Sequence, residues 1–415
     1  MVDRIDAQGA ISKKNQWLNQ IVAIFMLVYI LLFTVPLIWY LHGRNGGNSS
    51  MLAIFMFGFA LFVGMSDMLG GYDRYIYGEI FDSFADATSS GDSYAMTKAF
   101  ALVSPVEKGW GALNMVISWF TANRYIFILV VTLLTYTCLF VSLRRYAANY
   151  PLAMIVFMGL WFFFTFTYLR QVLAATIAWL SIPYIIKRQF WKFLPFALVT
   201  ISMHKSGVIF FPMYFLLCRR YEKRTLMIAV LAMLVVGLTP IPNALFMAYG
   251  DQTDIQQADY SSSGSSRIAY IVEAVLFLYF LFKSYDSFDR DRKTVVLVNL
   301  AFMFCLTLLF FSRSSNGGRL SWYYMIGIIT VFSAVGSSEN GLVGRKYGAF
   351  FVVLSFVLFF RILSAWGPMI SPYKSFLTNG VRDYDPIYNQ YEYDDNYAVN
   401  KMYRQPLRFK MQFTK

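Results

Sequence analysis

The chain consists mainly of about twelve long apolar segments, and the connections between these segments alternate in charge. Six connections hold sixteen Lys and Arg residues between them; the densest is 219–224, with sequence RRYEKR. The short alternate connections hold five cations, which are Arg170, Lys205, Arg267, Arg313 and Arg319. Because connections that remain in the cytoplasm are enriched in Lys and Arg, the alternation predicts a membrane protein whose sparse connections and two termini lie outside.

Composition supports a membrane protein and excludes several other classes. The chain is 58% hydrophobic and only 14% charged, which is typical of an integral membrane protein. A net charge of +13 would suggest nucleic acid in a soluble chain, but here the bases fall mostly in the predicted cytoplasmic connections, so we expect contacts with anionic membrane lipids instead. Two histidines and three scattered cysteines support neither a zinc site nor a disulfide framework, and we expect no metal or cofactor.

The sequence predicts an all-α polytopic membrane protein with about twelve transmembrane helices. We expect an N-terminal extension over 1–19, a transmembrane catalytic domain over 20–363 and a Tyr-rich C-terminal tail over 364–415. The central domain should carry a large outer loop at 67–124, ending in an interfacial amphipathic helix, and a flexible Ser-rich outer loop at 246–266. The expected spans are 20–41, 51–66, 125–143, 151–168, 171–186, 190–203, 206–218, 225–245, 267–283, 294–311, 321–336 and 347–363.

Two adjacent apolar segments, 190–203 and 206–218, are short for a bilayer crossing. They meet at His204 and Lys205, so they form either a pair of thin-slab helices or a re-entrant hairpin. Both arrangements would hold His204 below the outer surface. A neutral imidazole there could accept a proton from a sugar hydroxyl, because its reference pKa lies near neutral pH; its simpler role would be a polar helix cap.

The five sparse-connection cations are expected on one face of the membrane. Each Arg taken alone could be an anchor at a helix end. Five cations on one face need an anion, however, and a diphosphate suits the planar donors of Arg. The sequence therefore predicts a diphosphate site on the outer side.

The outer segment 67–124 offers carboxylates and aromatic rings. Asp73 and Glu107 are embedded among Gly and aromatic residues close to the membrane surface, which makes them competing candidates for a catalytic base. Tyr72, Tyr77 and Trp110 could stack on sugars, although aromatic residues are common at membrane interfaces in any case. The remaining acids of the segment are expected to be surface charges, notably Asp82, Asp86 and Asp92.

A series of short motifs follows in a fixed order along residues 50–330. These are Gly71-x-Asp73-x-x-x-Tyr77, Glu107-x-Gly109-Trp110, Arg170-Gln171-x-Leu173-Ala174, His204-Lys205-Ser206 and Arg319-Leu320-Ser321-Trp322-Tyr323-Tyr324. In order and spacing they resemble the EpsG family of Wzy-like bacterial polymerases of exopolysaccharide and O-antigen repeat units. Lys205, directly after His204, departs from the residue usual in that pattern.

The resemblance implies a multi-pass protein of the bacterial inner membrane with its active site facing the periplasm. Such enzymes transfer an undecaprenyl-diphosphate-linked glycan to the terminal sugar of another lipid-linked repeat unit. It implies that Arg170, Lys205 and Arg319 bind the diphosphate, with Arg267 and Arg313 as further candidates. It also favours His204 as the base, with Asp73 and Glu107 as acceptor-binding or alternative base residues. The implied partners are lipid-linked oligosaccharides, membrane lipids and a chain-length regulator.

Two other functions fit much of the same pattern. A lipid-linked oligosaccharide flippase also needs cations and about a dozen helices, but paired halves and charges at mid-depth are typical of transporters. An O-antigen ligase uses the same donor and differs in its acceptor. The clustering of lone charges at one surface favours an enzyme over a flippase.

Overall fold

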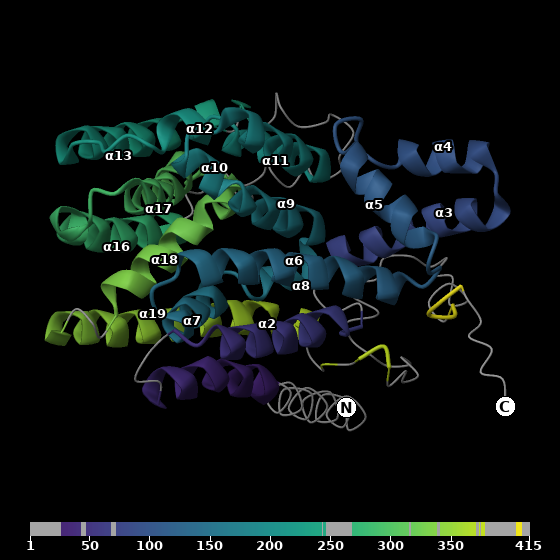
Figure 1. The fold of residues 1–415 in the computed structure, drawn as a ribbon, viewed down its shortest axis with the longest axis horizontal. Coiled ribbons are helices and arrows are strands. Elements are labelled where there is room, and N and C mark those ends of the chain that lie inside the picture. The colour runs from purple at the N-terminus through teal and green to yellow at the C-terminus, as the bar shows by residue number, and fades with distance from the viewer. Residues whose placement is uncertain are drawn as a thin grey trace, which may run out of the picture. The chain divides into compact units, whose positions relative to one another are not determined.

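The computed structural model describes residues 26–42, 47–67, 72–242, 244–245, 268–314, 317–337, 341–370, 373, 375–377 and 404–408. Within these residues the secondary structure is helical apart from turns and one isolated antiparallel bridge between Ser66 and Ser375 (Figure 1). The prediction of an all-α polytopic membrane protein is confirmed. The loop 246–266, Arg267, the N-terminal extension and most of the Tyr-rich tail lie outside the described residues.

Ten apolar helices are found in the described part of the chain, and each overlaps a predicted span. Five are long enough to cross a membrane: Arg124–Tyr146, Leu169–Ile186, Ile268–Ser287, Arg292–Phe310 and Gly341–Gly367. Five are shorter: Met26–His42, Ser49–Gly64, Tyr150–Leu160, Phe190–Met203 and Lys205–Leu216. The chain is therefore membrane-embedded, and half of these predicted spans are shorter than a full crossing by a single straight helix.

The chain divides into two compact units, the first of which comprises residues 1–137, 149–169 and 346–415. Its labelled helices are α2 (Ser49–Gly64), α3 (Tyr72–Ser90), α4 (Ser93–Ala101), α5 (Lys108–Ser118), α6 (Arg124–Tyr146, as far as residue 137), α7 (Tyr150–Leu160), α8 (Phe164–Thr167) and α19 (Gly341–Ile370). Helix α2 packs on α7 and α8. A Cβ atom at Gly159 would lie 2.6 Å from the Ser355 carbonyl oxygen, so α7 and α19 approach each other too closely for a larger residue there.

The segment 67–124, which the sequence predicts to be a large outer loop, contains three helices. Its described part folds into α3, α4 and α5, which pack on one another as Figure 1 shows. Helix α5 overlaps the stretch that the sequence predicts to be amphipathic. Helices α3 and α4 were not predicted, because they contain too many polar residues to stand out as apolar segments. Asp92 is exposed, as expected of a surface charge, and its carboxylate also accepts a hydrogen bond from the Tyr94 N–H at 2.8 Å and caps α4.

Of the other two acids expected to be surface charges, Asp82 is buried and Asp86 is not. Asp82 is 2% exposed and forms a buried ion pair with Arg124, whose guanidinium lies 5.5 Å from the Tyr75 ring centroid. Asp86 accepts from Arg404 at 2.6 Å. The expectation for Asp82 was wrong. The sequence shows that this residue is acidic, but it does not show that Arg124, forty-two residues later, lies beside it.

The second unit comprises residues 138–148 and 170–345. Its helices are α9 (Leu169–Leu180, from residue 170), α10 (Ile182–Ile186), α11 (Phe190–Met203), η1 (Lys205–Phe210), α12 (Met213–Leu216), α13 (Lys223–Gly237), α16 (Ile268–Ser284), η2 (Tyr285–Ser287), α17 (Arg292–Phe310), η3 (Gly317–Tyr324) and α18 (Met325–Val335). Helix α17 is central, because α13, α16, α18 and η3 all pack against it (Figure 1). A Cβ atom at Gly327 would lie 2.3 Å from the Ala301 nitrogen, so this glycine permits close contact between α18 and α17.

The two short apolar segments at 190–218 fold back on each other, with α11 packed against η1. The chain reverses at His204, whose extended backbone (φ −151°, ψ 125°) ends α11. A Cβ atom at Gly207 would lie 2.6 Å from the Thr200 side chain, so glycine is needed where η1 returns along α11. This reversal is what positions His204.

Candidate functional site

A chain of hydrogen bonds links His204 to the helix η3. The Ser206 N–H donates to His204 Nδ1 at 3.2 Å, and the Ser206 hydroxyl lies 2.8 Å from the same nitrogen. The Ser206 hydroxyl also lies 2.9 Å from the hydroxyl of Tyr323. The imidazole is therefore held by η1 on one side and, through Ser206, by η3.

Three cations act on this imidazole. Burial, followed by the charges of Arg170, Arg319 and Lys205, lowers the pKa of His204 well below its ordinary value. The three come from separate segments, the start of α9, η3 and η1. We call His204, Arg170, Lys205 and Arg319 the His204 cluster; the structure thus brings together four of the residues that the sequence predicted. All four are partly exposed.

Hydrogen bonds to the backbone fix η3 in this position. The Gln171 side chain donates to the Arg319 carbonyl at 3.1 Å, and the Trp179 indole N–H donates to the Tyr323 carbonyl at 2.9 Å. The Tyr324 hydroxyl donates to the Ile209 carbonyl at 2.7 Å and so ties η3 to η1. Sequence reasoning gave no role to Gln171, Ser206 or Tyr323, although each lies in the same short motif as a residue of the cluster.

The other two predicted diphosphate ligands are not placed in this cluster by the described contacts. Arg313 donates to the Leu238 carbonyl at 2.9 Å, which caps the C-terminal end of α13. A cation at a helix C-terminus also interacts favourably with the helix dipole. Arg267 lies outside the described residues.

The predicted acceptor residues belong to the first unit. Asp73 is partly exposed in the first turn of α3, and Glu107 is 2% exposed at the N-cap of α5. Tyr77 and Trp110 are buried, with their rings edge to face at 5.6 Å. Because both side chains are buried, neither ring presents an accessible face on which a sugar could stack. The Tyr72 side chain lies outside what the structure describes.

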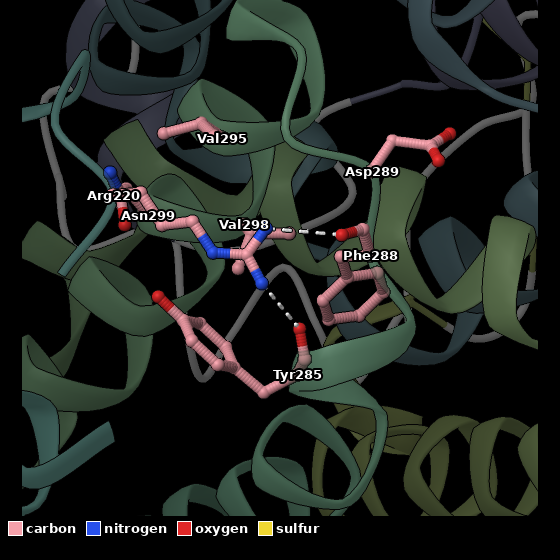
Figure 2. A pocket seen from close by; sticks show the side chains of 7 residues that line it. All are labelled: Arg220, Tyr285, Phe288, Asp289, Val295, Val298 and Asn299. Atoms are coloured by element: carbon pink, nitrogen blue, oxygen red, sulfur yellow. Dashed lines mark hydrogen bonds between the residues drawn. The ribbon is translucent and has the colours of Figure 1, made fainter. Parts of the chain in front are cut away.

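A small cavity lies near Arg220, and the side chain of this arginine occupies most of the space there (Figure 2). Arg220 donates to the carbonyls of Phe288 at 3.2 Å and Tyr285 at 3.3 Å, and its guanidinium lies 5.2 Å from the Tyr285 ring centroid. The remaining cavity volume is about 10 Å³, which is room for little more than one water molecule. Arg220 therefore stabilises the connection after α16 through these hydrogen bonds and leaves no room for a larger ligand.

Comparison with known proteins identifies a family. The model of the EpsG family matches residues 51–375, which is most of the chain and includes every residue of the His204 cluster. No curated protein and no solved structure matches the chain significantly. The chain therefore belongs to the EpsG family, a family of Wzy-like polysaccharide polymerases.

Proposed function

We propose that this protein transfers an undecaprenyl-diphosphate-linked glycan onto the terminal sugar of a second lipid-linked repeat unit, at the periplasmic face of the inner membrane. In this reaction the acceptor hydroxyl oxygen forms a bond to the anomeric carbon of the donor glycan. The bond between that carbon and the diphosphate oxygen breaks, and undecaprenyl diphosphate leaves with the electron pair. The proton of the acceptor hydroxyl passes to a base.

The observation that carries the proposal is that the charges of Arg170, Arg319 and Lys205 all lower the pKa of His204, while Gln171, next to Arg170, donates to the Arg319 carbonyl at 3.1 Å. Three cations from three segments make an anion site, and a leaving diphosphate gains negative charge as the glycosidic bond breaks. Fixed cations stabilise that charge most where they are already oriented. They supply the positive charge that a metal ion provides in other transferases, so we propose metal-independent transfer.

The remaining roles follow the sequence motifs. Asp73 and Glu107 are proposed to bind the acceptor and are the candidate bases, while His204 is proposed to act among the cations of its cluster. Arg313 and Arg267 are proposed as secondary contacts to the donor. Arg170 lies at the start of a span-length helix, Leu169–Ile186, rather than in its middle, which favours an enzyme acting at the membrane surface over a flippase.

The test is complementation of a polymerase-null strain with Arg170→Ala, Arg319→Ala and His204→Ala variants, read as the ladder of polysaccharide lengths. We expect loss of the long products in all three. Lys98→Ala is the matched control, because Lys98 is an exposed cation of α4 outside the cluster. Wild-type ladders from Arg170→Ala and Arg319→Ala at normal protein levels would refute the proposed site.

The same strains separate polymerase from ligase. A lost polymerase leaves acceptors that carry at most one repeat unit. A lost ligase instead leaves finished polymer on its lipid carrier. Accumulation of carrier-linked polymer in the null strain would therefore reassign the protein as a ligase.

A further inference from the structure

We infer that His204 works as a neutral hydrogen-bond donor through Nε2, held in that state by Ser206 and Tyr323, and does not take the acceptor proton on Nε2. This inference rests on the proposed function for the identity of the ligand, a sugar-linked diphosphate. One hydrogen bond to the His204 ring has a direction that is fixed by its donor.

A backbone N–H can only donate. Because the Ser206 N–H donates to His204 Nδ1 at 3.2 Å, Nδ1 must be the acceptor nitrogen of the ring. A neutral imidazole carries its single proton on the other nitrogen, so Nε2 is protonated. The backbone at the α11–η1 reversal thus selects the tautomer.

The directions of the next two hydrogen bonds follow. With no proton on Nδ1, the Ser206 hydroxyl at 2.8 Å must donate to it. A serine hydroxyl has one proton, so its contact of 2.9 Å with Tyr323 must use the tyrosine proton. The chain therefore runs from Tyr323 to Ser206 to Nδ1, and every donor in it points toward the imidazole.

Two features of the site oppose protonation of the ring: the hydrogen bond to Nδ1 and the neighbouring positive charges. An imidazolium would turn Nδ1 into a donor that faces the Ser206 N–H, which cannot accept. Its charge would also meet Arg170, Arg319 and Lys205. A neutral Nε2–H avoids both costs and still donates to an oxygen of the diphosphate as negative charge develops there. The acceptor proton then leaves to a group other than Nε2 of His204.

The tautomer can be observed directly, because the chain has only two histidines, His42 and His204. We would label the full-length protein with ¹⁵N-histidine and use His42→Gln to leave one imidazole. One-bond ¹⁵N–¹H correlations should place the proton on Nε2 and leave Nδ1 unprotonated. A proton on Nδ1 would overturn the inference, whatever the activity of the protein.

Activity provides a second, separable measurement. The amide nitrogen of His204→Gln can donate from near the Nε2 position, whereas His204→Asn reaches only the Nδ1 position and neither side chain is a base. We expect polymerisation by His204→Gln within about tenfold of wild type and losses of about a hundredfold or more for His204→Asn and His204→Ala. If His204→Gln is as inactive as His204→Ala while Arg170→Ala also fails, the donor role is wrong and the proposed function stands.

Ser206 is tested as a positioning residue by rescue. Ser206→Ala keeps the backbone N–H but removes the hydroxyl donor, so we expect the proton to stay on Nε2 while the ¹⁵Nδ1 resonance shifts and the ladders shorten. Ser206→Thr restores the hydroxyl and should restore both. Loss of activity in Ser206→Ala without any change in the His204 resonances would show a merely structural role.

A separate cavity lies among the basic connections of the second unit. We propose that a cavity lined by Arg145, Tyr146, Lys187 and Lys293 binds the phosphate of an anionic membrane lipid. The cavity has a volume of about 260 Å³, and Pro183 and Ile186 complete its lining. Three cations and no acid line it, so the ligand it suits is an anion.

Tyr146 adds a donor to these charges. Its side chain is 6% exposed, yet its hydroxyl has no hydrogen-bond partner among the described residues. A buried hydroxyl without a partner costs free energy that a bound phosphate oxygen would recover.

The position of the cavity identifies a lipid as the source of the phosphate. Tyr146 ends the span Arg124–Tyr146, Lys187 follows the span Leu169–Ile186, and Lys293 lies in the first turn of the span Arg292–Phe310. Lipid phosphates lie at the depth where spans end, and the cavity opens at the ends of three of them. Each nearby cation strengthens the attraction of an anionic lipid.

The test uses the full-length protein in nanodiscs, with retention of phosphatidylglycerol measured by native mass spectrometry. Lys187→Gln and Tyr146→Phe should each lower retention several-fold, with about fivefold expected for the lost charge. Arg144→Gln is the matched control, because Arg144 is an exposed neighbour that does not line the cavity. Equal losses in Arg144→Gln and Lys187→Gln would overturn the site. Inorganic phosphate that competes with the lipid at equal concentration would overturn the lipid as its occupant.

Discussion

At the scale of single residues, the His204 cluster joins a neutral ring to fixed positive charges. Burial and three neighbouring cations all disfavour the imidazolium. The same cations favour an incoming anion, so binding of the diphosphate and the charge state of His204 are linked. The effect of each cation can therefore be measured as a change in the pKa of His204.

Arg319→Gln should raise the pKa of His204. Arg319 is one of the charges that lower this pKa, so its removal makes the imidazolium easier to form and moves the titration midpoint to higher pH. The measurement is a pH titration of the ¹⁵N-histidine resonances. Lys98→Gln, which changes the net charge equally in α4, should leave the midpoint in place. An unchanged midpoint in Arg319→Gln would show that Arg319 does not face the ring.

The cations that lie near His204 were predictable as a group from the sequence, whereas their hydrogen-bond partners were not. Arg170, Lys205 and Arg319 could be found because each stands in a connection with few other charges. Arg313 satisfied the same criterion but caps α13, since the criterion does not say which carbonyl lies within reach. The Ser206 and Tyr323 contact spans a sequence separation of 117 residues, and the sequence pattern carries no signal for it.

At the scale of elements, arginines hold α3 and its neighbouring helices in the first unit through hydrogen bonds to backbone carbonyls. Arg74 of α3 is fully buried and donates to the carbonyls of Phe166 at 2.9 Å, Ser66 at 2.8 Å and Val63 at 3.1 Å. Burial lowers the pKa of Arg74 to about 10, which still leaves it charged at neutral pH. One side chain thus joins α3 to the end of α2 and to α8.

Arg74→Met should destabilise the protein strongly. The substitution leaves three carbonyls without their donor, and each unsatisfied group costs about 1–3 kcal/mol. We expect a clearly lower melting temperature in detergent by a thermal-shift measurement. Arg74→Lys should rescue little, because a single ammonium cannot reproduce the planar fork of the guanidinium. Lys98→Met, an exposed substitution on α4, is the control; equal melting of Arg74→Met and Lys98→Met would contradict this role.

Residues 404–408 attach the C-terminal tail to the same helices. Arg408 donates to the Ser118 carbonyl at 2.7 Å, the Ser89 hydroxyl at 2.8 Å and the Ala85 carbonyl at 2.8 Å, so it joins α3 to α5. Arg404 instead pairs with Asp86, whose side chain is 46% exposed. Exposed ion pairs contribute little, about 0–1 kcal/mol.

The two arginines should therefore differ in effect. Arg408→Ala should speed amide hydrogen exchange at the C-terminal end of α3, because it removes three donors that hold this end. Arg404→Ala should change exchange much less. Exchange that responds more to Arg404→Ala than to Arg408→Ala would show that the surface ion pair, and not the guanidinium fork, holds the tail.

At the scale of the whole chain, hydrophobic pattern predicted the membrane helices better than the polar ones. Every apolar helix of the described residues overlaps a segment expected from the sequence, because long apolar runs have few alternatives in a bilayer. Helices α3 and α4 were missed because they mix polar and apolar residues and depend on partners such as Arg74 and the Asp92 cap. The charge alternation remains the sequence feature that orients the protein.

The orientation can be tested with a pair of cysteines in a variant whose three native cysteines are replaced by alanine. Ser93 is exposed in α4 of the predicted outer segment, and Ser287 is exposed in the basic connection after α16. In intact spheroplasts, an impermeant maleimide should label Ser93→Cys, whereas Ser287→Cys should react only after the membrane is permeabilised. The charge rule gives this direction because the connection 283–293 keeps its four Lys and Arg residues inside. The reverse labelling pattern would place the His204 cluster on the cytoplasmic side, where periplasmic repeat units cannot reach it, and would exclude the proposed reaction.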